Sequence, residues 1–237
     1  MFINTLRIEN GSTYKAHLAM ALKLFELPPP SELPGDVVEC GTWKGGSAAN
    51  LSIVCKLVGR KLIVCDSFEG LPEPLPDTPD SREYSRGDFC GTLPEVKANI
   101  ARCGEIEVCE FVEGWFENTL PDLKRPIILA WVDVDLESSL ETCVLSLWPL
   151  LPDRGLFFLD ECVDLGYVAL FFSERWWRKH FDRNPPGLIG ARTGLGLGNF
   201  FVGPYDEIDD HPQQHAGTAG YTQKSFEGYW SGPDSRR

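Results

Sequence analysis

DVVECGTWKGGS, residues 36–47, decides the fold that the sequence predicts. An apolar run ends at Glu39-Cys40, and a loop with glycines at 41, 45 and 46 leads into a helical stretch that Gly59 ends. Glycine allows tight turns and close approach of the backbone to a ligand, and the helix start favours polar or anionic groups. The spacing is ExGxxxGxS and differs from the GxGxxG of dinucleotide-binding loops. The stretch therefore predicts a strand, a ligand loop and a helix, with a purely structural turn as the alternative.

The same alternation continues outward from this loop. Apolar strand-like runs occupy 61–68, 107–116, 126–135 and 154–162, and helical patterns occupy 14–27, 93–103, 138–151 and 168–181. Two further runs, 187–194 and 197–204, suit a final pair of strands, and an antiparallel pair is one arrangement. This order predicts a doubly wound, mostly parallel α/β sheet of seven strands with an antiparallel C-terminal strand.

The predicted organisation has three parts. Residues 1–34 form a helical N-terminal extension, residues 35–204 form the α/β domain, and residues 205–237 form a polar C-terminal tail. Within the domain, residues 71–92 contain four prolines and little periodicity. That segment is too long for an ordinary connection, so we expect a lid or substrate loop there.

Asp66 sharpens the interpretation of the glycine loop. It ends the second predicted strand, 27 residues after Glu39, which suits one helix between adjacent strands. An acid at that place in a doubly wound fold accepts hydrogen bonds from ribose hydroxyls, although a helix cap is the alternative role. Glu39 would repel a pyrophosphate but suits an ammonium group. Together the two acids favour a nucleoside with an amino-acid tail, as in S-adenosylmethionine.

Acidic residues also follow two other strongly apolar runs. Asp133 and Asp135 end WVDVD, and Asp160 and Glu161 end FFLDE. The carboxyl ends of parallel strands share one edge, where ligands bind. Clustered carboxylates there are costly unless they bind a cation or share protons, and hard oxygen ligands suit Mg²⁺. Caps on the following helices are the competing interpretation.

Several of these motifs together resemble the macrocin O-methyltransferase family. GDVVECGTWKGGSAANLS, CDSFEGLPEP, GDFCGTLPEVKANI, VEGWFENTLPDL, VDVDLESS and FFLDE occur in that family's order, from about residue 35 to about residue 165. The resemblance implies a class I methyltransferase (Rossmann-like) fold, S-adenosylmethionine as methyl donor, Mg²⁺ or a similar divalent cation, and methylation of sugar hydroxyls on macrolides and related natural products. Departures from the family pattern include Glu137 at a position usually held by tyrosine, Glu161 in the second acidic pair, and Cys162.

The resemblance also implies roles for individual residues. Loop residues would bind the donor, Asp66 would contact its ribose, Ser67 and Phe68 would flank the adenosine, and the stretch 113–116 would enclose it. The implied donor site is Glu39, Gly41, Thr42, Gly45, Ser47, Asp66, Ser67, Phe68, Gly114, Trp115 and Phe116. The implied metal ligands are Asp133, Asp160 and Glu161.

Composition limits the remaining choices. The formal net charge of −13 disfavours sequence-independent nucleic-acid binding. No apolar run approaches the ~20 residues of a membrane span, and the first residues lack a secretory pattern, so we expect no membrane partner. The eight cysteines form no CxxC pair and predict free thiols in a reducing cytoplasm. The four histidines lie apart from the strand-end acids and are interpreted as surface or internally hydrogen-bonded groups. A homodimer or higher homo-oligomer is compatible with the helical extension.

The sequence hypothesis is metal-assisted methyl transfer from S-adenosylmethionine to a hydroxyl of a small-molecule acceptor. Asp133 is the candidate for combined metal ligand and general base. A catechol-type aromatic O-methyltransferase and a nucleoside-binding protein without catalysis remain as alternatives. The ExGxxxG spacing disfavours a nicotinamide dehydrogenase. The identity of the acceptor stays open at this stage.

Overall fold

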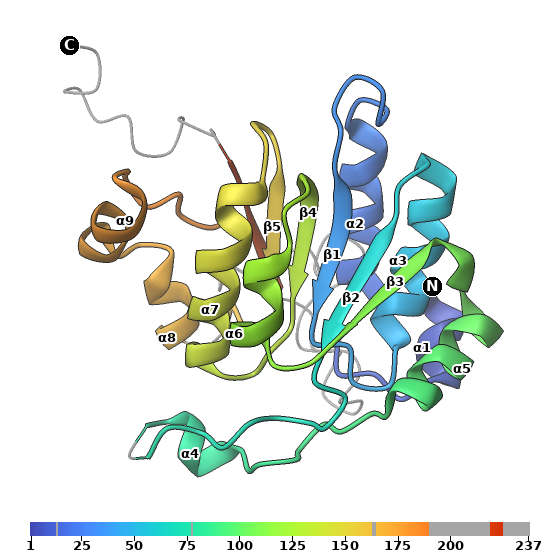
Figure 1. The fold of residues 1–237 in the computed structure, drawn as a ribbon, viewed down its shortest axis with the longest axis horizontal. Coiled ribbons are helices and arrows are strands. Elements are labelled where there is room, and N and C mark those ends of the chain that lie inside the picture. The colour runs from blue at the N-terminus through green and yellow to red at the C-terminus, as the bar shows by residue number, and fades with distance from the viewer. Residues whose placement is uncertain (13, 77, 163–164, 190–218, 225–237) are drawn as a thin grey trace, which may run out of the picture.

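A computed structural model describes residues 1–12, 14–76, 78–162, 165–189 and 219–224. Their core is one six-stranded sheet of order β3-β2-β1-β4-β5-β6 (Figure 1). The first five strands are parallel, and β6 runs antiparallel to β5. The strands are β1 (Asp36–Cys40), β2 (Leu62–Asp66), β3 (Cys109–Glu113), β4 (Ile127–Val132), β5 (Leu156–Leu159) and β6 (Gly220–Gln223).

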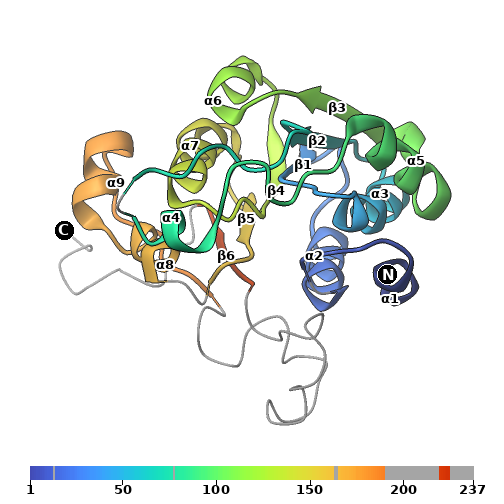
Figure 2. The same cartoon turned by 90° about the horizontal axis from the view of Figure 1, so that it is seen from below.

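Helices cover both faces of the sheet, as Figures 1 and 2 show. One face carries α1 (Phe2–Arg7), α2 (Tyr14–Glu26), α3 (Gly46–Val58) and α5 (Leu93–Cys103). The other face carries α6 (Phe116–Thr119), α7 (Glu137–Leu147), α8 (Leu165–Leu170) and α9 (Glu174–Phe181). Short 3₁₀ turns lie at Ile106–Val108, Leu120–Asp122 and Trp148–Leu150.

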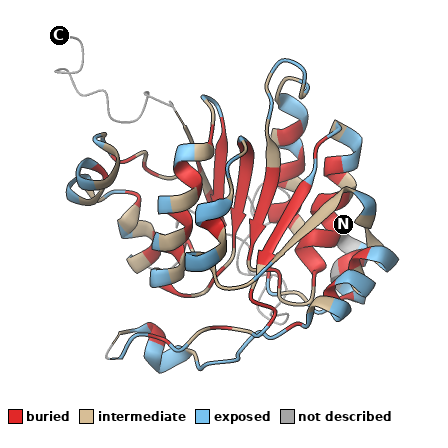
Figure 3. Ribbon diagram, viewed as in Figure 1, coloured by how far each residue is buried: buried red, intermediate tan, exposed pale blue. Residues whose placement is uncertain are grey.

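Alternation along the strands explains this three-layer packing. Val37 belongs to the cluster under α2 and α3, whereas its neighbour Val38 belongs to the cluster under α7. Successive side chains of a strand point to opposite faces, so a strand buried on both sides is apolar throughout. The central strands are accordingly buried along their length (Figure 3). All eight cysteines are free, and five of them are buried.

The expected seven-stranded sheet is wrong for the part of the chain that the structure describes, where the sheet has six strands. The antiparallel edge strand is Gly220–Gln223, inside the stretch interpreted as a polar tail. Tyr221 stacks on Phe158 with ring centroids 4.9 Å apart. This apolar contact holds the short β6 against β5. Of the two strands expected at 187–194 and 197–204, Ile189 forms an isolated bridge with Tyr221, and 190–218 lie outside the described residues.

The loop 71–92 is tied to the domain at its base and near its middle. The Leu71 N–H donates to the Asp88 carbonyl at 2.8 Å, and the Leu71 carbonyl accepts from the Gly87 N–H at 2.9 Å. The loop carries the short helix α4 (Asp80–Glu83). Asp80 is buried, and its Oδ2 accepts a 3.0 Å hydrogen bond from the backbone N–H of Glu137, the first residue of α7. The loop therefore lies across the carboxyl ends of the parallel strands (Figure 1) and caps α7 from outside.

The N-terminal segment packs on α3 through a buried polar centre. His17 of α2 is fully buried, and both of its ring nitrogens are hydrogen-bonded. Nε2 lies 2.9 Å from Ser12 Oγ, and Nδ1 lies 2.9 Å from Asn50 Nδ2. His17 is thus an internally hydrogen-bonded histidine, one of the two roles that the sequence allowed it.

This environment predicts a pH effect on stability. Burial lowers the pKa of His17 from 6.5 to about 3. Below pH 6.5 His17 is protonated in the unfolded chain but stays neutral in the folded chain. The contribution of neutral His17 to the unfolding free energy is therefore complete above pH 6.5 and falls as the pH decreases toward 3. Between pH 7 and pH 5 we expect the wild type to lose about 2 kcal/mol of unfolding free energy relative to His17→Gln. Urea unfolding of both proteins at each pH measures this difference, and a pH-independent difference would contradict it.

No helix within the described ranges combines the length and apolar character that crossing a membrane requires.

Candidate active site

A cavity of about 420 Å³ opens at the carboxyl ends of the parallel strands. Its wall comes from the loops after β1 to β5 together with the loop 71–92 and the N-terminal segment. The lining residues include Asn10, Gly11, Gly41, Thr42, Trp43, Ser47, Asp66, Ser67, Gly70, Leu71, Pro72, Phe89, Gly114, Trp115, Phe116, Glu117, Asp133, Val134, Asp135, Ser139, Asp160 and Glu161.

The glycine loop lies against the exit of β4. Gly41 has φ +80°, and a Cβ atom there would overlap the carbonyl oxygen of Asp133. Gly45 has φ +84° and lies against Val96 of α5, where a Cβ atom would be 3.1 Å away. Only glycine accepts both the left-handed backbone and such close contacts. The loop thus holds β1, β4 and α5 together beneath one wall of the cavity.

Glu39 lies beneath this loop and is hydrogen-bonded to it. Its side chain is fully buried and receives hydrogen bonds from the Thr42 hydroxyl, at 3.3 Å, and from the Ser47 hydroxyl. Burial raises the pKa of Glu39 to about 8, and the two hydroxyl donors partly oppose that rise. Thr42 and Ser47 themselves line the cavity. Glu39 therefore acts on the cavity through these two hydroxyls.

Asp66 joins the loops after β1 and β2. Its Oδ2 accepts from the Thr42 N–H at 2.8 Å, and its Oδ1 accepts from the Phe68 N–H at 2.7 Å. Burial raises the pKa of Asp66, and backbone donors oppose the rise. Each carboxylate oxygen has a second lone pair, so Asp66 can still accept from a ligand. It lines the cavity, where it can reach a bound ligand.

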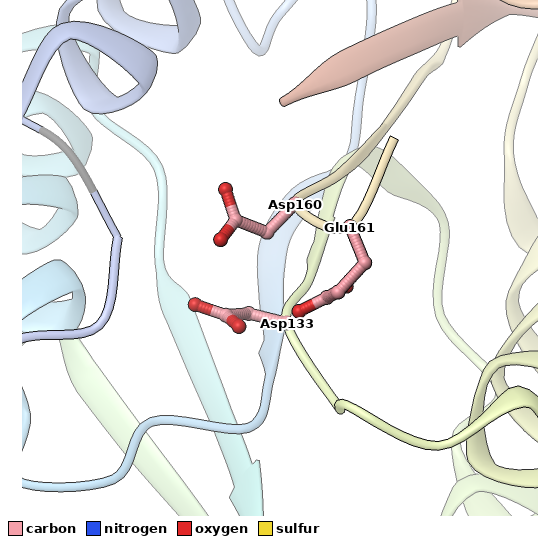
Figure 4. Close-up of side chains that lie close together, drawn as sticks. All are labelled: Asp133, Asp160 and Glu161. Carbon is pink, nitrogen blue, oxygen red and sulfur yellow. The ribbon is translucent and has the colours of Figure 1, made fainter. Parts of the chain in front are cut away.

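Three carboxylates converge at the exits of β4 and β5. Figure 4 shows Asp133, Asp160 and Glu161 directed into a common space, and one ligand oxygen from each lies within 4.8 Å of the others. Burial, and then the charge of Asp160, raises the pKa of Asp133 well above its usual range. Burial, and then the charge of Asp133, does the same to the pKa of Glu161. Glu161 Oε2 is buried with no hydrogen-bond partner among the described residues.

Most of the predicted site residues meet in this one cavity. The glycine-loop, β2-exit and β3-exit positions that line it are Gly41, Thr42, Ser47, Asp66, Ser67, Gly114, Trp115 and Phe116, with the acids Asp133, Asp160 and Glu161 beside them. Glu39, Gly45 and Phe68 do not line it. The first two shape the loop from behind, and Phe68 is buried with φ +57° at the turn that Asp66 holds.

The sequence did not single out an aromatic group at the same cavity. Trp43 and Phe89 line it with ring centroids 5.4 Å apart and nearly perpendicular, and Tyr84 lies 6.3 Å from Phe89. Trp43 and Phe89 both have positive φ, at 44° and 54°. Such backbone strain in non-glycine residues clusters at functional sites. Trp43 lies inside the glycine loop, but no local pattern marks Phe89 or the N-terminal residues Asn10 and Gly11.

The strand order, the glycine loop after β1 and the acid that ends β2 define a class I methyltransferase fold. Residues 24–180 match the sequence model of the macrocin-O-methyltransferase (TylF) family. Because that match covers more than half of the 237 residues, the chain belongs to this family. The resemblance noted in the sequence is thereby confirmed.

Curated relatives share this part of the chain. The chain is 34% identical over 139 residues to the 8-demethyl-8-(2,3-dimethoxy-α-L-rhamnosyl)-tetracenomycin-C 4′-O-methyltransferase of Streptomyces olivaceus, covering 54% of this chain and 53% of that protein. It is 28% identical over 142 residues to the mycinamicin III 3″-O-methyltransferase of Micromonospora griseorubida, covering 54% and 56%. The matches therefore span about half the length of these relatives.

Solved structures support the fold. The O-methyltransferase NovP superposes with a TM-score of 0.66 at 21% identity, covering 88% of this chain and 79% of that one. The calicheamicin methyltransferase CalS11 superposes with a TM-score of 0.55 at 18% identity, covering 88% and 78%. At these identities the comparison concerns the fold alone.

Proposed function

We propose that this protein is an S-adenosylmethionine-dependent O-methyltransferase that acts, with a divalent cation, on a hydroxyl of a small molecule. The observation that carries the proposal is that one cavity joins the glycine loop and Asp66 to the three carboxylates. A donor site and an acid site that share a cavity can bring a methyl group and an ionising hydroxyl into line. One relative is named as the 4′-O-methyltransferase of a rhamnosyl-bearing tetracenomycin, which favours a sugar hydroxyl as acceptor.

The donor would lie along the loops after β1, β2 and β3. Its ribose hydroxyls would donate to Asp66, and its adenosine would lie among Ser67 and the stretch from Gly114 to Phe116. The amino-acid tail would reach the start of α3, where Thr42 and Ser47 face the cavity above Glu39. This orientation directs the sulfonium methyl group toward the exit of β4, where Asp133 lies.

The three acids fit a divalent cation. Asp133, Asp160 and Glu161 supply only oxygen ligands, and the buried, unpartnered Glu161 Oε2 is an atom that needs a cation or proton. When bound, Mg²⁺ or a similar ion would polarise the acceptor hydroxyl and lower its pKa. Asp133 would hold it with Asp160 and Glu161.

Asp133 would also receive the hydroxyl proton. It lines the cavity at the exit of β4, between the donor loop and the other two acids, where a carboxylate can accept that proton. As the proton moves to Asp133, the acceptor oxygen forms a bond to the methyl carbon and the bond from carbon to sulfur breaks. The donor then leaves as the neutral thioether S-adenosylhomocysteine, and the proton passes to solvent.

The acceptor would enter from the side of the loop 71–92. Phe89 and Trp43 present aromatic surface at the cavity, and Tyr84 lies beside Phe89. Burial, and then the charges of Asp135 and Glu161, raises the pKa of Tyr84, so its hydroxyl stays protonated and lies near the acids. Apolar walls with a few convergent polar groups are typical of small-molecule sites.

Two measurements test the proposal. Calorimetry with S-adenosylhomocysteine should show saturable binding to the folded protein, and no binding would refute the donor assignment. Methyl transfer to a glycoside should stop after exhaustive chelation and return with added Mg²⁺. Activity that survives chelation would refute the metal role. Transfer to a catechol and not to glycosides would favour the aromatic alternative, and binding without donor consumption would favour a non-catalytic protein.

A further inference from the structure

A directed chain of hydrogen bonds runs through the N-terminal segment. Asn4 Nδ2 donates to Asn50 Oδ1 at 3.0 Å. Asn50 Nδ2 then lies 2.9 Å from His17 Nδ1, and because an amide nitrogen is only a donor, Nδ1 accepts and the ring proton is on Nε2. Nε2 donates to Ser12 Oγ at 2.9 Å, and Ser12 Oγ donates to Asn10 Oδ1 at 3.4 Å. We call these five residues the His17 relay.

The relay crosses separate elements in a fixed order. It begins on α1, passes through α3 and α2, and ends in the turn before α2. Figure 2 shows α1, α2 and α3 on the same side of the sheet. Asn4, Ser12, His17 and Asn50 are all buried, so each would lose a hydrogen-bond partner without replacement by water if the relay were broken. In neutral His17 one ring nitrogen accepts a hydrogen bond and the other donates one. The tautomer of His17 therefore fixes which of its neighbours in the relay donates and which accepts.

Asn10, the last residue of the relay, forms part of the wall of the cavity described above. Asn10 and Gly11 both line that cavity. The Asn10 side chain lies directly against the start of α3, since its Cβ, Cγ and Oδ1 would each be 3.0 Å from a Cβ atom at Gly46. Asn10 Nδ2 also donates to the Ser12 carbonyl at 2.6 Å. An ion pair between Glu9 and Lys44 fastens the same turn to the glycine loop.

We infer that His17 is a positioning residue for the methyl donor, and that it acts by fixing the turn at Asn10-Gly11 over the donor's amino-acid tail. This inference rests on the proposed function, because it assigns the end of the cavity beside Gly46 and Ser47 to that tail. The turn would lie beside the tail, next to the start of α3 that the Asn10 side chain contacts. A turn held in place before the ligand binds costs less ordering entropy on binding, so the relay raises donor affinity by preorganisation.

The inference predicts a selective loss of donor affinity. His17→Phe fills the same space without hydrogen bonds and should raise both the Kd for S-adenosylhomocysteine and the KM for the donor about tenfold, the size expected for one lost ordering contact. The kcat and the KM for the acceptor should change little, because none of the five relay residues is one of the three converging acids. His17→Gln, which can still donate and accept, should recover most of the affinity. Ser12→Ala removes the hydroxyl that joins His17 Nε2 to Asn10 Oδ1, leaves the other relay side chains in place, and should reproduce the effect of His17→Phe.

Leu24→Val is the matched control. Leu24 is buried two turns further along α2 and does not line the cavity, so the variant loosens the same helix without touching the relay. It should lower the unfolding free energy and leave the Kd for S-adenosylhomocysteine unchanged. Equal affinity of the wild type and Ser12→Ala, measured by calorimetry on folded samples, would overturn the inference alone, even if His17→Phe fails to fold. No binding by the wild type would overturn the donor assignment and the inference with it.

Discussion

Asp133→Asn lowers the kcat for methyl transfer by about 10³-fold or more in our expectation, because it removes the proposed base and one of three metal ligands together. The two side chains have nearly the same shape, so the cavity keeps its form. The variant also removes one charge from a cluster in which Asp160 and Asp133 repel each other. The unfolding temperature of the metal-free protein should therefore stay constant or rise while activity falls. Steady-state kinetics and thermal unfolding of the same sample measure both quantities.

Asp135→Asn provides the comparison. Asp135 lines the same cavity two residues later, and its φ of +57° is a conformation that asparagine tolerates well. It stands outside the group of three converging oxygens. We expect the kcat of Asp135→Asn to fall less than about tenfold, because Asp135 would contribute only its charge to the electrostatic potential of the cavity. Equal losses for the two variants would contradict the assignment of Asp133. Added Mg²⁺ should raise the unfolding temperature of the wild type and of Asp135→Asn, but not that of Asp133→Asn.

Gly41→Ala should have the largest effect on stability. Its methyl group would overlap the Asp133 carbonyl oxygen, and the strands cannot separate easily because Cys40 pairs with Val132 and accepts from the Asp133 N–H at 3.0 Å. The overlap adds to the cost of a left-handed alanine, about 1–2 kcal/mol. We expect a total loss above about 4 kcal/mol, or no folded protein at all.

Gly59→Ala separates the two causes. Gly59 ends α3 with φ +71°, close to that of Gly41, but nothing lies within 4 Å of the position of its missing Cβ atom. This variant should cost only the left-handed backbone term of about 1–2 kcal/mol. Chemical unfolding of both variants gives the comparison. Similar losses would mean that backbone conformation alone, and not the contact with β4, makes glycine necessary at position 41.

The fold could be predicted where burial imposes apolar runs. Strands β1, β2, β4 and β5 are buried on both faces, so each appears in the sequence as a mostly apolar stretch. Strand β3 lies at an edge of the sheet and is only partly buried. Strand β6 could not be predicted in this way. It is four residues long, lies at an edge and owes its place to the stacking of Tyr221 on Phe158, a contact 63 positions apart in the sequence.

The same distinction holds for the site. The acids after β4 and β5 could be placed together because parallel strands bring their carboxyl ends to one edge. The role of Glu39 could not be anticipated, since its burial under Thr42 and Ser47 depends on how the loop folds back. Asn10 and Phe89 reach the cavity from segments without periodicity, so only the tertiary structure reveals them.

The bond from the Glu137 N–H to Asp80 has an evolutionary consequence. The loop 71–92 is held at Leu71, at Asp80 and at Gly87-Asp88. Two short arcs of chain are therefore free to change in sequence and length while their anchors stay constant. Exchange of those arcs would change the acceptor side of the proposed site and leave the glycine loop and the three acids as they are.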